Sequence, residues 1–490
     1  MDKRSAGILL SVTALPSRHG IGDFGRTSFE FIDHLAAMGF KVWQILPLNP
    51  LGYGNSPYQP FSSFAIDEQF VDLDALTAEG LIEKTPDFNA DAPKVHYDAV
   101  KAFKFPYLKA AFEKFLELHG TRKITAFRKS HPWVEDWSVF MTFKRRYPSS
   151  WNEWPQEIQD WIKTRPALSK EDKHACLFEI WLQMTLYAQW EKVHAYAKKK
   201  GIKIIGDIPF YVGFDSCDVW ANQDTFLLDK DTHLPSVVAG VPPDYFSAVG
   251  QRWGNPIYDW KKLEANGFEF IINRIHLNSV LYDILRLDHF RAFDTYWEIP
   301  ASCPTAVDGE WKEPPGYLFF DTLFAKYPDL DIIAEDLGDL RPEVLELRDH
   351  YNFPGMNVIQ FTFSDCELLH KGDWNRENSV AYLDTHDNDT MLSYFYLLPE
   401  NEQGAWLHKL GEMGIVLGTP VDRMMVYCMR KPARLAVLSM QDILNLDVQA
   451  RTNVPGTVDD RNWTWKLVSY KDFLARRKFL SDLIAETGRK

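Results

Sequence analysis

The sequence lacks the motifs by which most cofactor and metal sites are recognised. Its five cysteines form an odd, scattered set without a CxxC pair, which indicates neither a disulfide framework nor a zinc site. No HExxH, GxGxxG or GxxxxGK[ST] motif occurs, so metalloprotease, dinucleotide and phosphate-loop chemistry have no support. We therefore expect that the protein needs no metal and no organic cofactor.

Positive charge and long apolar runs are also scarce. Lys and Arg number 54 against 68 Asp and Glu, which gives a formal net charge of −14. Nucleic acids and anionic membranes are bound through basic patches, so we expect neither as a partner. No run of 18 apolar residues occurs, and the first apolar stretch is too short and broken for a signal peptide. The sequence thus predicts a cytoplasmic protein and leaves a neutral ligand open.

Short apolar runs bounded by Gly, Pro or Asp recur along the 490 residues. Several are separated by stretches with helical spacing, and this alternation implies a parallel sheet. Eight such runs occur, which is the number of strands that closes a (β/α)8 barrel. We predict an α/β fold, a single (β/α)8 TIM barrel over residues 1–490, with helical and loop insertions at the carboxyl end of the strands. The predicted strands are 7–12, 41–48, 203–208, 283–288, 331–335, 355–361, 380–383 and 435–440.

Two intervals between predicted strands are too long to be simple loops. Residues 49–200, after the second strand, contain predicted helices at 103–118, 136–146 and 175–200, the last ending in KKKG with cations and a glycine stop. We expect a mainly helical insertion there, formed by one or more subdomains. Residues 210–262, after the third strand, are rich in Pro, Gly and aromatic residues and are predicted to form a structured loop insertion over the barrel mouth.

Three of the predicted strands lead directly into carboxylates. The run 283–288 ends at Asp288, the run 331–335 ends at Glu335, and the run 380–383 is followed closely by Asp387. These acids are too far apart in the sequence to share a helix or a hairpin. Because the carboxyl ends of barrel strands meet at one mouth, we expect the three acids to converge there.

Paired carboxyl groups suit the cleavage of a glycosidic bond. One group protonates the leaving oxygen and the other stabilises or attacks the anomeric carbon. Glu335 follows three apolar residues, which would raise its pKa as an acid requires, and Arg286 would share a face with Asp288 and favour its ionised form. Each feature also has a structural explanation: an ion pair at a strand end, a helix N-cap at Glu335, or a polar turn at 385–390.

Aromatic side chains are abundant, with 17 Trp and 20 Tyr. Most are expected to fill the core of a chain of this size. Those that stand beside Gly and Pro in predicted loops are better candidates for stacking on sugar rings. They are Tyr53, Tyr58, Tyr245, Phe246, Trp253 and Tyr258.

Six segments together resemble the 4-α-glucanotransferases, also called amylomaltases. They are LRLDHFRAFDTYWEIP, IIAEDLG, THDNDT, GYGNSPYQPFSSFA, IIGDIPFYVGFDSCDVW and GVPPDYFSAVGQRWGNPIY. They occur in the expected order and span nearly the whole chain. The stretch PPDYFSAVGQRWGNP is the most specific, because it lies in a predicted loop where no packing rule dictates the residues.

The resemblance implies an α-amylase-like barrel that transfers segments of an α-1,4-glucan donor to glucose or a maltooligosaccharide with retention. By motif position, Asp288 matches the nucleophile, Glu335 the general acid/base and Asp387 the third carboxylate. Arg286 and His386 match sugar-binding partners around the cleaved bond. Further residues in motifs that line the groove are Ser56, Tyr58, Asp207, Tyr245, Phe246, Gln251 and Trp253.

Two rival functions remain beside transfer: an α-glucan hydrolase on the same barrel, and a catalytically inactive glucan-binding protein. The inactive protein would be expected to have lost an acid, but Asp288, Glu335 and Asp387 are all present. The departures from the family pattern are small. One of them, Asp384, stands where glycine often precedes THDN and adds negative charge near Asp387. The sequence does not indicate the oligomeric state.

Overall fold

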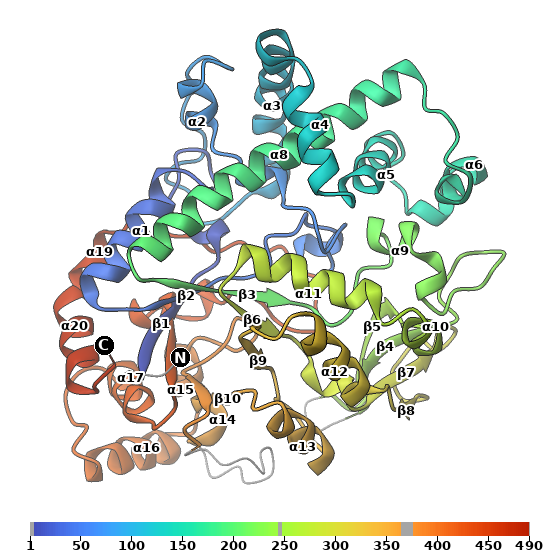
Figure 1. Ribbon diagram of the computed structural model, residues 1–490. Helices are drawn as coiled ribbons and strands as arrows, with labels where there is room; N and C mark the ends of the chain where they lie inside the picture. The colour runs from blue at the N-terminus through green and yellow to red at the C-terminus, as the bar shows by residue number, and fades with distance from the viewer. Residues whose placement is uncertain (1–3, 244–246, 364–375, 490) are drawn as a thin grey trace.

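The protein is built around a parallel eight-stranded sheet (Figure 1). The structure is a computed structural model that describes residues 4–243, 247–363 and 376–489. The hydrogen-bonded order of the strands is β10-β11-β12-β1-β2-β3-β6-β9, and the backbone N–H of Ala334 donates to the carbonyl of Pro354 at 3.0 Å, which joins the two ends of the sheet. The predicted barrel is thereby confirmed. Its strands are β1 (Ser5–Leu9), β2 (Val42–Gln44), β3 (Lys203–Ile208), β6 (Ile284–Leu287), β9 (Ile332–Ala334), β10 (Gly355–Val358), β11 (Ser379–Tyr382) and β12 (Leu435–Ser439).

All eight strands overlap the predicted apolar runs, because both faces of each strand are covered. Along β12, Leu435 and Val437 belong to a cluster that fills the barrel, whereas Ala436 and Leu438 pack into the larger core outside it. This alternation follows from the two-residue period of a strand. Strands buried on both faces carry continuous apolar residues, which made them visible in the sequence. The filled barrel gives the site at its mouth a rigid floor.

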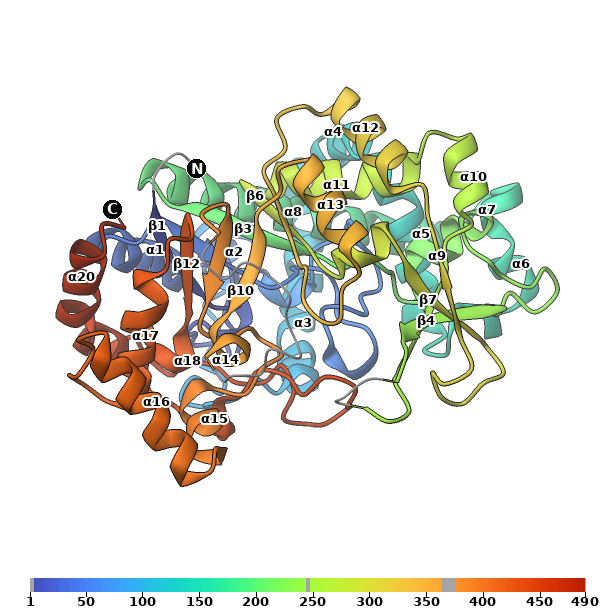
Figure 2. The ribbon, with the colours of Figure 1, turned by 90° about the horizontal axis from the view of Figure 1, so that it is seen from below.

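Helices surround the barrel on the outside (Figures 1 and 2). The two chain ends lie close together, since the Arg489 side chain donates to the carbonyl of Ser5 at 3.0 Å. In the part of the chain that the structure describes, no helix is both long and apolar enough to cross a membrane. The helices on and around the barrel are α1 (Arg26–Met38), α11 (Glu269–Leu281), α12 (Gly316–Lys326), α13 (Pro342–His350), α14 (Ile359–Thr362), α15 (Met391–Leu397), α16 (Glu400–Glu412), α17 (Pro420–Arg430), α18 (Met440–Ile443), α19 (Lys471–Ala475) and α20 (Arg477–Glu486).

The interval between β2 and β3 is helical. The predicted helices at 103–118, 136–146 and 175–200 overlap α3, α5 and α8, and the Ser169 side chain caps α8 by accepting from the N–H of Asp172. Figure 1 shows α8 running from the group of helices at the top down beside α1. The division of this interval into subdomains stays a proposal. Its helices are α2 (Leu73–Ala78), α3 (Tyr97–His119), α4 (Arg122–Ser130), α5 (Val134–Arg146), α6 (Gln156–Gln159), α7 (Trp161–Thr164) and α8 (Lys170–Lys199).

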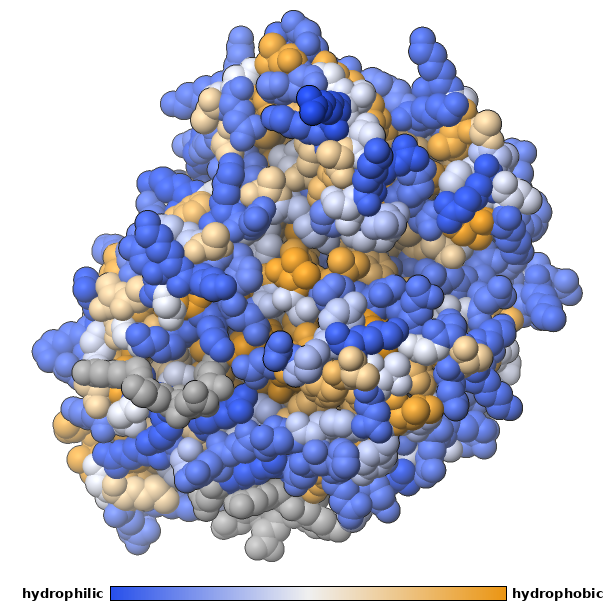
Figure 3. Space-filling model, viewed as in Figure 1, coloured by the Kyte–Doolittle hydropathy of each residue, from blue (hydrophilic) through white to orange (hydrophobic). Residues whose placement is uncertain are grey.

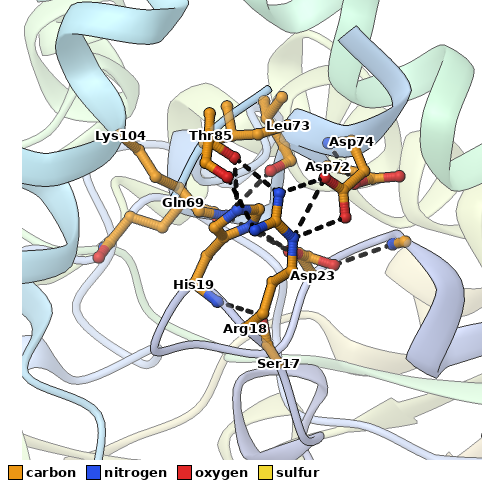
Figure 4. A network of polar contacts seen from close by, with 12 residues as sticks. Ser17, Arg18, His19, Asp23, Gln69, Asp72, Leu73, Asp74, Thr85 and Lys104 are labelled. Atoms are coloured by element: carbon orange, nitrogen blue, oxygen red, sulfur yellow. Dashed lines mark hydrogen bonds and ion pairs between the residues drawn. The ribbon is translucent and has the colours of Figure 1, made fainter. Parts of the chain in front are cut away.

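A buried polar network fastens α2 and α3 to the segment that precedes α1 (Figure 4). The Lys104 side chain of α3 is 1% exposed; its Nζ donates to the carbonyls of Gln69 at 2.6 Å and Val71 at 2.9 Å and lies 3.6 Å from Asp23 Oδ2. Nearby, Arg18 pairs with Asp74 at 2.7 Å. Because a buried ammonium group needs a counter-charge and hydrogen-bond acceptors, Lys104 fixes α3 in one position.

A second, antiparallel sheet lies beside the barrel in the order β5-β4-β7-β8. Figure 2 shows β4 and β7 on the side of the molecule away from α20. Two of its strands fall within residues 210–262, together with helices α9 (Cys217–Ala221) and α10 (Trp260–Ala265). Gly and Pro within these strands obscure the period-two pattern, so sequence reasoning missed them. The strands are β4 (Val237–Val241), β5 (Gln251–Pro256), β7 (Tyr296–Pro300) and β8 (Glu310–Lys312).

Hydrophilic side chains predominate on the face shown in Figure 3, with apolar side chains scattered among them. This pattern fits the acidic composition, since charged residues make up 25% of the chain. Scattered exposed apolar residues are ordinary on a folded protein.

Candidate active site

The carboxyl ends of β6, β9 and β11 bring the three predicted acids into one groove. Asp288 directly follows β6, Glu335 directly follows β9, and Asp387 lies in the loop after β11. All three side chains line a groove with a volume of about 1100 Å³. Acids from three separate strands thus face one space at the mouth of the barrel, as expected of a site on this fold.

Arg286 of β6 forms the electrostatic centre of the groove. Its Nη1 donates to both carboxylate oxygens of Asp207 on β3, at 2.8 Å each, and to Asp288 Oδ1 at 2.9 Å. Arg286 is 3% exposed and Asp207 is 1% exposed. The hydroxyl of Tyr58 donates to Asp207 Oδ2 at 2.8 Å. Asp207 therefore lies beneath the groove and orients both Arg286 and Tyr58.

The Asp288 carboxyl group has an unusual pKa in this setting. Withdrawal from water raises its pKa to about 8; Arg286 opposes the rise, while the charges of Asp207, Glu335 and Asp387 add to it. The sequence predicted the effect of Arg286 in the correct direction. The net shift of the Asp288 pKa that was inferred from Arg286 alone was wrong. The burial of Asp288 is not visible in the sequence, and Arg286 is shared with Asp207.

Glu335 is held by the backbone. Its Oε2 accepts from the N–H of His289 at 2.7 Å, and its Oε1 accepts from the N–H of Leu337 at 3.1 Å. Burial, the largest cause, raises the pKa of Glu335 although Arg286 and these two N–H groups act in the opposite direction. This upward shift of the Glu335 pKa agrees in direction with the rise that was predicted from the apolar run before Glu335. A raised pKa favours the protonated form that a general acid needs.

Asp387 and His386, in the loop after β11, form another wall of the groove. Asp387 Oδ1 accepts from the Asn453 side chain at 2.7 Å, and the Asp387 side chain is 43% exposed toward the groove. His386 lies 3.4 Å from Asp387 Oδ2 and stacks on Tyr58 with ring centroids 5.0 Å apart. Burial lowers the pKa of His386, so the imidazole is neutral over most of the physiological range. Tyr58 thus connects this wall to Asp207.

The remaining predicted binding residues divide into two groups. Ser56, Tyr58, Gln251 and Trp253 line the groove, and the Trp253 indole donates to Gln251 Oε1 at 3.1 Å. Tyr245 and Phe246 lie outside the described residues.

The family model described as 4-alpha-glucanotransferase matches residues 10–471. The chain belongs to the 4-alpha-glucanotransferase family. This membership confirms the resemblance that was seen in the sequence motifs.

Individual relatives of this 4-alpha-glucanotransferase family member match over nearly their full length. The 4-alpha-glucanotransferase of Synechocystis sp. is 42% identical, with 95% of this chain and 94% of the relative covered. That of Thermus thermophilus is 40% identical, with 95% of each covered. Among solved structures, the amylomaltase from Streptococcus agalactiae in complex with acarbose has a TM-score of 0.93 and 35% identity, covering 99% of this chain and 100% of that chain. Amylomaltase from Corynebacterium glutamicum, at 17% identity and a TM-score of 0.75, covering 99% and 75%, shows the fold alone.

Sequence reasoning missed several groove residues of this 4-alpha-glucanotransferase family member, among them His289. His289 has a left-handed backbone, with φ of 51°, and its ring packs edge-on against Trp253 with centroids 4.9 Å apart. Its buried Nε2 has no hydrogen-bond partner among the described residues. Burial lowers the pKa of His289 to about 3, so the ring is neutral and can offer a hydrogen bond to a ligand. Its position beside Asp288 was the only signal in the sequence.

Within residues 4–243, 247–363 and 376–489, no three His, Cys, Asp or Glu side chains are grouped so that they could hold a metal ion. The acids of the groove are engaged by Arg286, Asn453 and backbone N–H groups instead.

Proposed function

We propose that the chain is a 4-α-glucanotransferase that moves a segment of an α-1,4-glucan to the 4-hydroxyl of an acceptor glucose or maltooligosaccharide. The observation that carries the proposal is the meeting of Asp288, Glu335 and Asp387 around Arg286 in one groove of a chain from this family. A neutral, hydroxyl-rich ligand suits a groove whose walls combine aromatic rings with carboxylates and neutral imidazoles.

The first step is the formation of a glycosyl ester. The ionised Asp288 carboxylate attacks the anomeric carbon while the carboxylic acid of Glu335 protonates the departing glycosidic oxygen. The bond from the anomeric carbon to that oxygen breaks as the bond to Asp288 forms. The leaving chain departs with a free 4-hydroxyl.

The second step returns the site to its starting state. Glu335, now a carboxylate, removes the proton from the 4-hydroxyl of an acceptor, and that oxygen displaces Asp288 from the anomeric carbon. Two inversions give net retention. This mechanism predicts a separation of about 5 Å between the two carboxyl groups, as in retaining enzymes generally.

The charges in the groove are suited to this cycle. Four carboxyl groups, those of Asp207, Asp288, Glu335 and Asp387, lie around Arg286 and repel one another, so full ionisation of all four is costly. One proton held between Asp288 and Glu335 relieves this repulsion, and the active form places it on Glu335. The remaining negative charge on Asp288 and Asp387 stabilises the positive anomeric carbon of the transition state.

The two neutral histidines are assigned to binding. His289 has an unused ring nitrogen beside Asp288, and His386 is fixed by its stacking on Tyr58. Each can hydrogen-bond a sugar hydroxyl without adding a positive charge that would repel the developing oxocarbenium ion. Asp387 is the remaining acceptor for sugar hydroxyls in this wall.

Transfer exceeds hydrolysis only where an acceptor sugar displaces water from the groove. The strand β5 supplies Gln251 and Trp253 to the groove wall, so the segment 240–255 contributes directly to the surface that an acceptor would cover. Gly54 and Val458 also line the groove and approach each other closely, since a side-chain carbon on the glycine would lie 3.3 Å from Val458 Cγ1. We assign the exclusion of water to these segments.

Chromatography of the products from maltotriose tests the proposed function. A transferase produces glucose together with chains longer than maltotriose, because the released segment is added to another sugar. An α-glucan hydrolase produces no chain longer than the substrate, and an inactive glucan-binding protein leaves maltotriose unchanged. Asp288→Asn, prepared in parallel, should show neither reaction, which controls for contaminating glycosidases.

A further inference from the structure

The groove continues past the three acids to an exposed tryptophan, Trp311 of β8. Trp311 is 40% exposed, although it lines the same groove as Asp288. No described residue accepts a hydrogen bond from its indole N–H. An aromatic ring and an unused donor are therefore presented together at a place that the proposed reaction does not use.

The Trp311 ring is held in position before any ligand arrives. The guanidinium carbon of Arg291 lies 4.1 Å from the ring centroid, and the Trp297 ring packs edge-on at 5.1 Å. Arg291 is itself fixed, because its Nη1 donates to the carbonyl of Asp339 at 2.6 Å. A ring that is already immobilised loses little conformational entropy when a ligand stacks on it.

Trp311 lies outside the region of bond cleavage. Asp288, His289 and Arg291 line the groove one after another along the chain. Arg291 lies in the 3-10 helix Phe290–Phe293, three positions after Asp288 in the chain, and its side chain extends further before Trp311 is reached. The groove volume of about 1100 Å³ also exceeds the upper end of ordinary ligand pockets, about 1000 Å³. The groove can therefore hold sugar units beyond those on either side of the cleaved bond.

The charges around Trp311 are paired within the protein. Arg341 contacts both oxygens of Asp294, at 2.6 and 2.9 Å, and Glu313 at 2.8 Å. The guanidinium of Arg291 adds a second cation beside these carboxylates, so the opposite charges largely offset one another and the wall attracts neither an anion nor a cation strongly. It offers an apolar ring for the C–H face of a sugar, with polar groups beside it for hydroxyls, which suits a neutral carbohydrate.

We propose that Trp311, supported by Arg291, forms an outer subsite that stacks on a glucose unit of the α-glucan remote from the cleaved bond. The inference rests on the proposed function and deepens it, because it makes Trp311 a determinant of chain-length preference. A glucan long enough to reach Trp311 gains a stacking contact. A shorter one gains less.

The decisive experiment compares maltoheptaose with maltotriose as donors for the wild-type protein and for Trp311→Ala. The ratio of the two kcat/KM values is expected to fall about tenfold in the variant, the size of one lost aromatic stacking contact. Trp311→Phe should retain most of the wild-type ratio. Tyr317→Ala, which removes a 47% exposed aromatic ring of α12 outside the groove, should leave the ratio unchanged. An unchanged ratio in Trp311→Ala would overturn the proposal.

Binding measured without turnover separates this inference from the proposed function. In a Glu335→Gln background, calorimetry should give a larger rise in the Kd of maltoheptaose than of maltotriose when Trp311→Ala is added. If transfer is absent but this difference in Kd is found, the outer subsite stands while the assigned activity fails. If both sugars lose affinity equally, Trp311 has only a structural role, even where transfer is observed.

Discussion

Arg286 and Asp288, two residues apart at the end of β6, are joined by a hydrogen bond of 2.9 Å from a nitrogen that also serves Asp207. The positive charge of Arg286 is therefore divided between two carboxylates. Withdrawal from water raises the pKa of Asp288, and because Arg286 is shared it opposes this rise only in part, so the pKa is about 8. Asp207 therefore influences the pKa of Asp288, although Asp207 does not line the groove.

Activity should depend on pH through Asp288 and Glu335, with Asp207 setting the position of the acid limb. Below the lower apparent pKa both groups are protonated and no nucleophile is present; above the upper one both are ionised and no acid remains. Asp207→Asn removes a charge that raises the pKa of Asp288, so the acid limb of kcat/KM should move to lower pH. The exposed Glu346 of α13 supplies a control, since Glu346→Gln should leave the profile in place. An acid limb that does not move in Asp207→Asn would contradict this electrostatic account.

The stability of the protein should carry a second pH dependence, from the carboxyl pair Asp384 and Asp442. The two side chains, 3% and 0% exposed, are hydrogen-bonded to each other, which requires a proton on one of them. Burial raises the pKa of Asp384 well above its ordinary value and that of Asp442 to about 6, and the charge of Asp389 adds to both. Folding therefore retains protons that the unfolded chain releases above about pH 4, so the pair contributes less to the free energy of unfolding as pH rises.

Asp384→Asn keeps a hydrogen-bond donor toward Asp442 but removes this proton dependence. The Tm of the variant relative to the wild type should therefore increase steadily between pH 5 and pH 9 in calorimetric scans. Asp231→Asn, at an exposed position, is the matched control and should show a constant difference. A constant difference for Asp384→Asn as well would mean that the pair does not hold a proton.

The buried network in Figure 4 should be important for stability. Lys104→Met removes the ammonium group that serves two carbonyls and Asp23, and it leaves buried charge without compensation. We expect a loss of about 3–5 kcal/mol in the free energy of unfolding, the usual effect of breaking a buried ion pair. Lys101→Met, on the same helix but 48% exposed beside Glu68, should cost about 1 kcal/mol or less. Equal losses in denaturant titrations of the two variants would refute the assignment.

The barrel and its three acids were predictable because short stretches of sequence determine them. A strand buried on both faces must be apolar throughout, and a carboxylate that ends such a run must surface at the barrel mouth. Asp288 and Glu335 were found in this way, and the short segment after β11 placed Asp387 beside them. The wall containing β4, β5, β7 and β8 was not predictable. Glycine or proline interrupts the pattern of β4 and β5, β7 ends in proline, and β8 is only three residues long.

The electrostatics of the groove could not be predicted for a different reason. The pKa of Asp288 depends on the burial and charge of residues that arrive from distant strands, such as Asp207 on β3. His289 can reach a ligand because its left-handed backbone turns the ring into the groove. Trp311 reaches the same groove from an edge strand that no sequence pattern connected to the acids.

In the proposed mechanism, Asp288 is the group that forms a covalent bond to the sugar. A Glu335→Gln variant incubated with α-maltotriosyl fluoride should still form the ester, because fluoride leaves without a proton from Glu335, whereas the missing base slows its release. Mass spectrometry of proteolytic fragments should then find one maltotriosyl unit on the peptide that contains Asp288, and none when Asp288→Asn is added. Release of fluoride with no adduct, or with an adduct on any other residue, would contradict the mechanism.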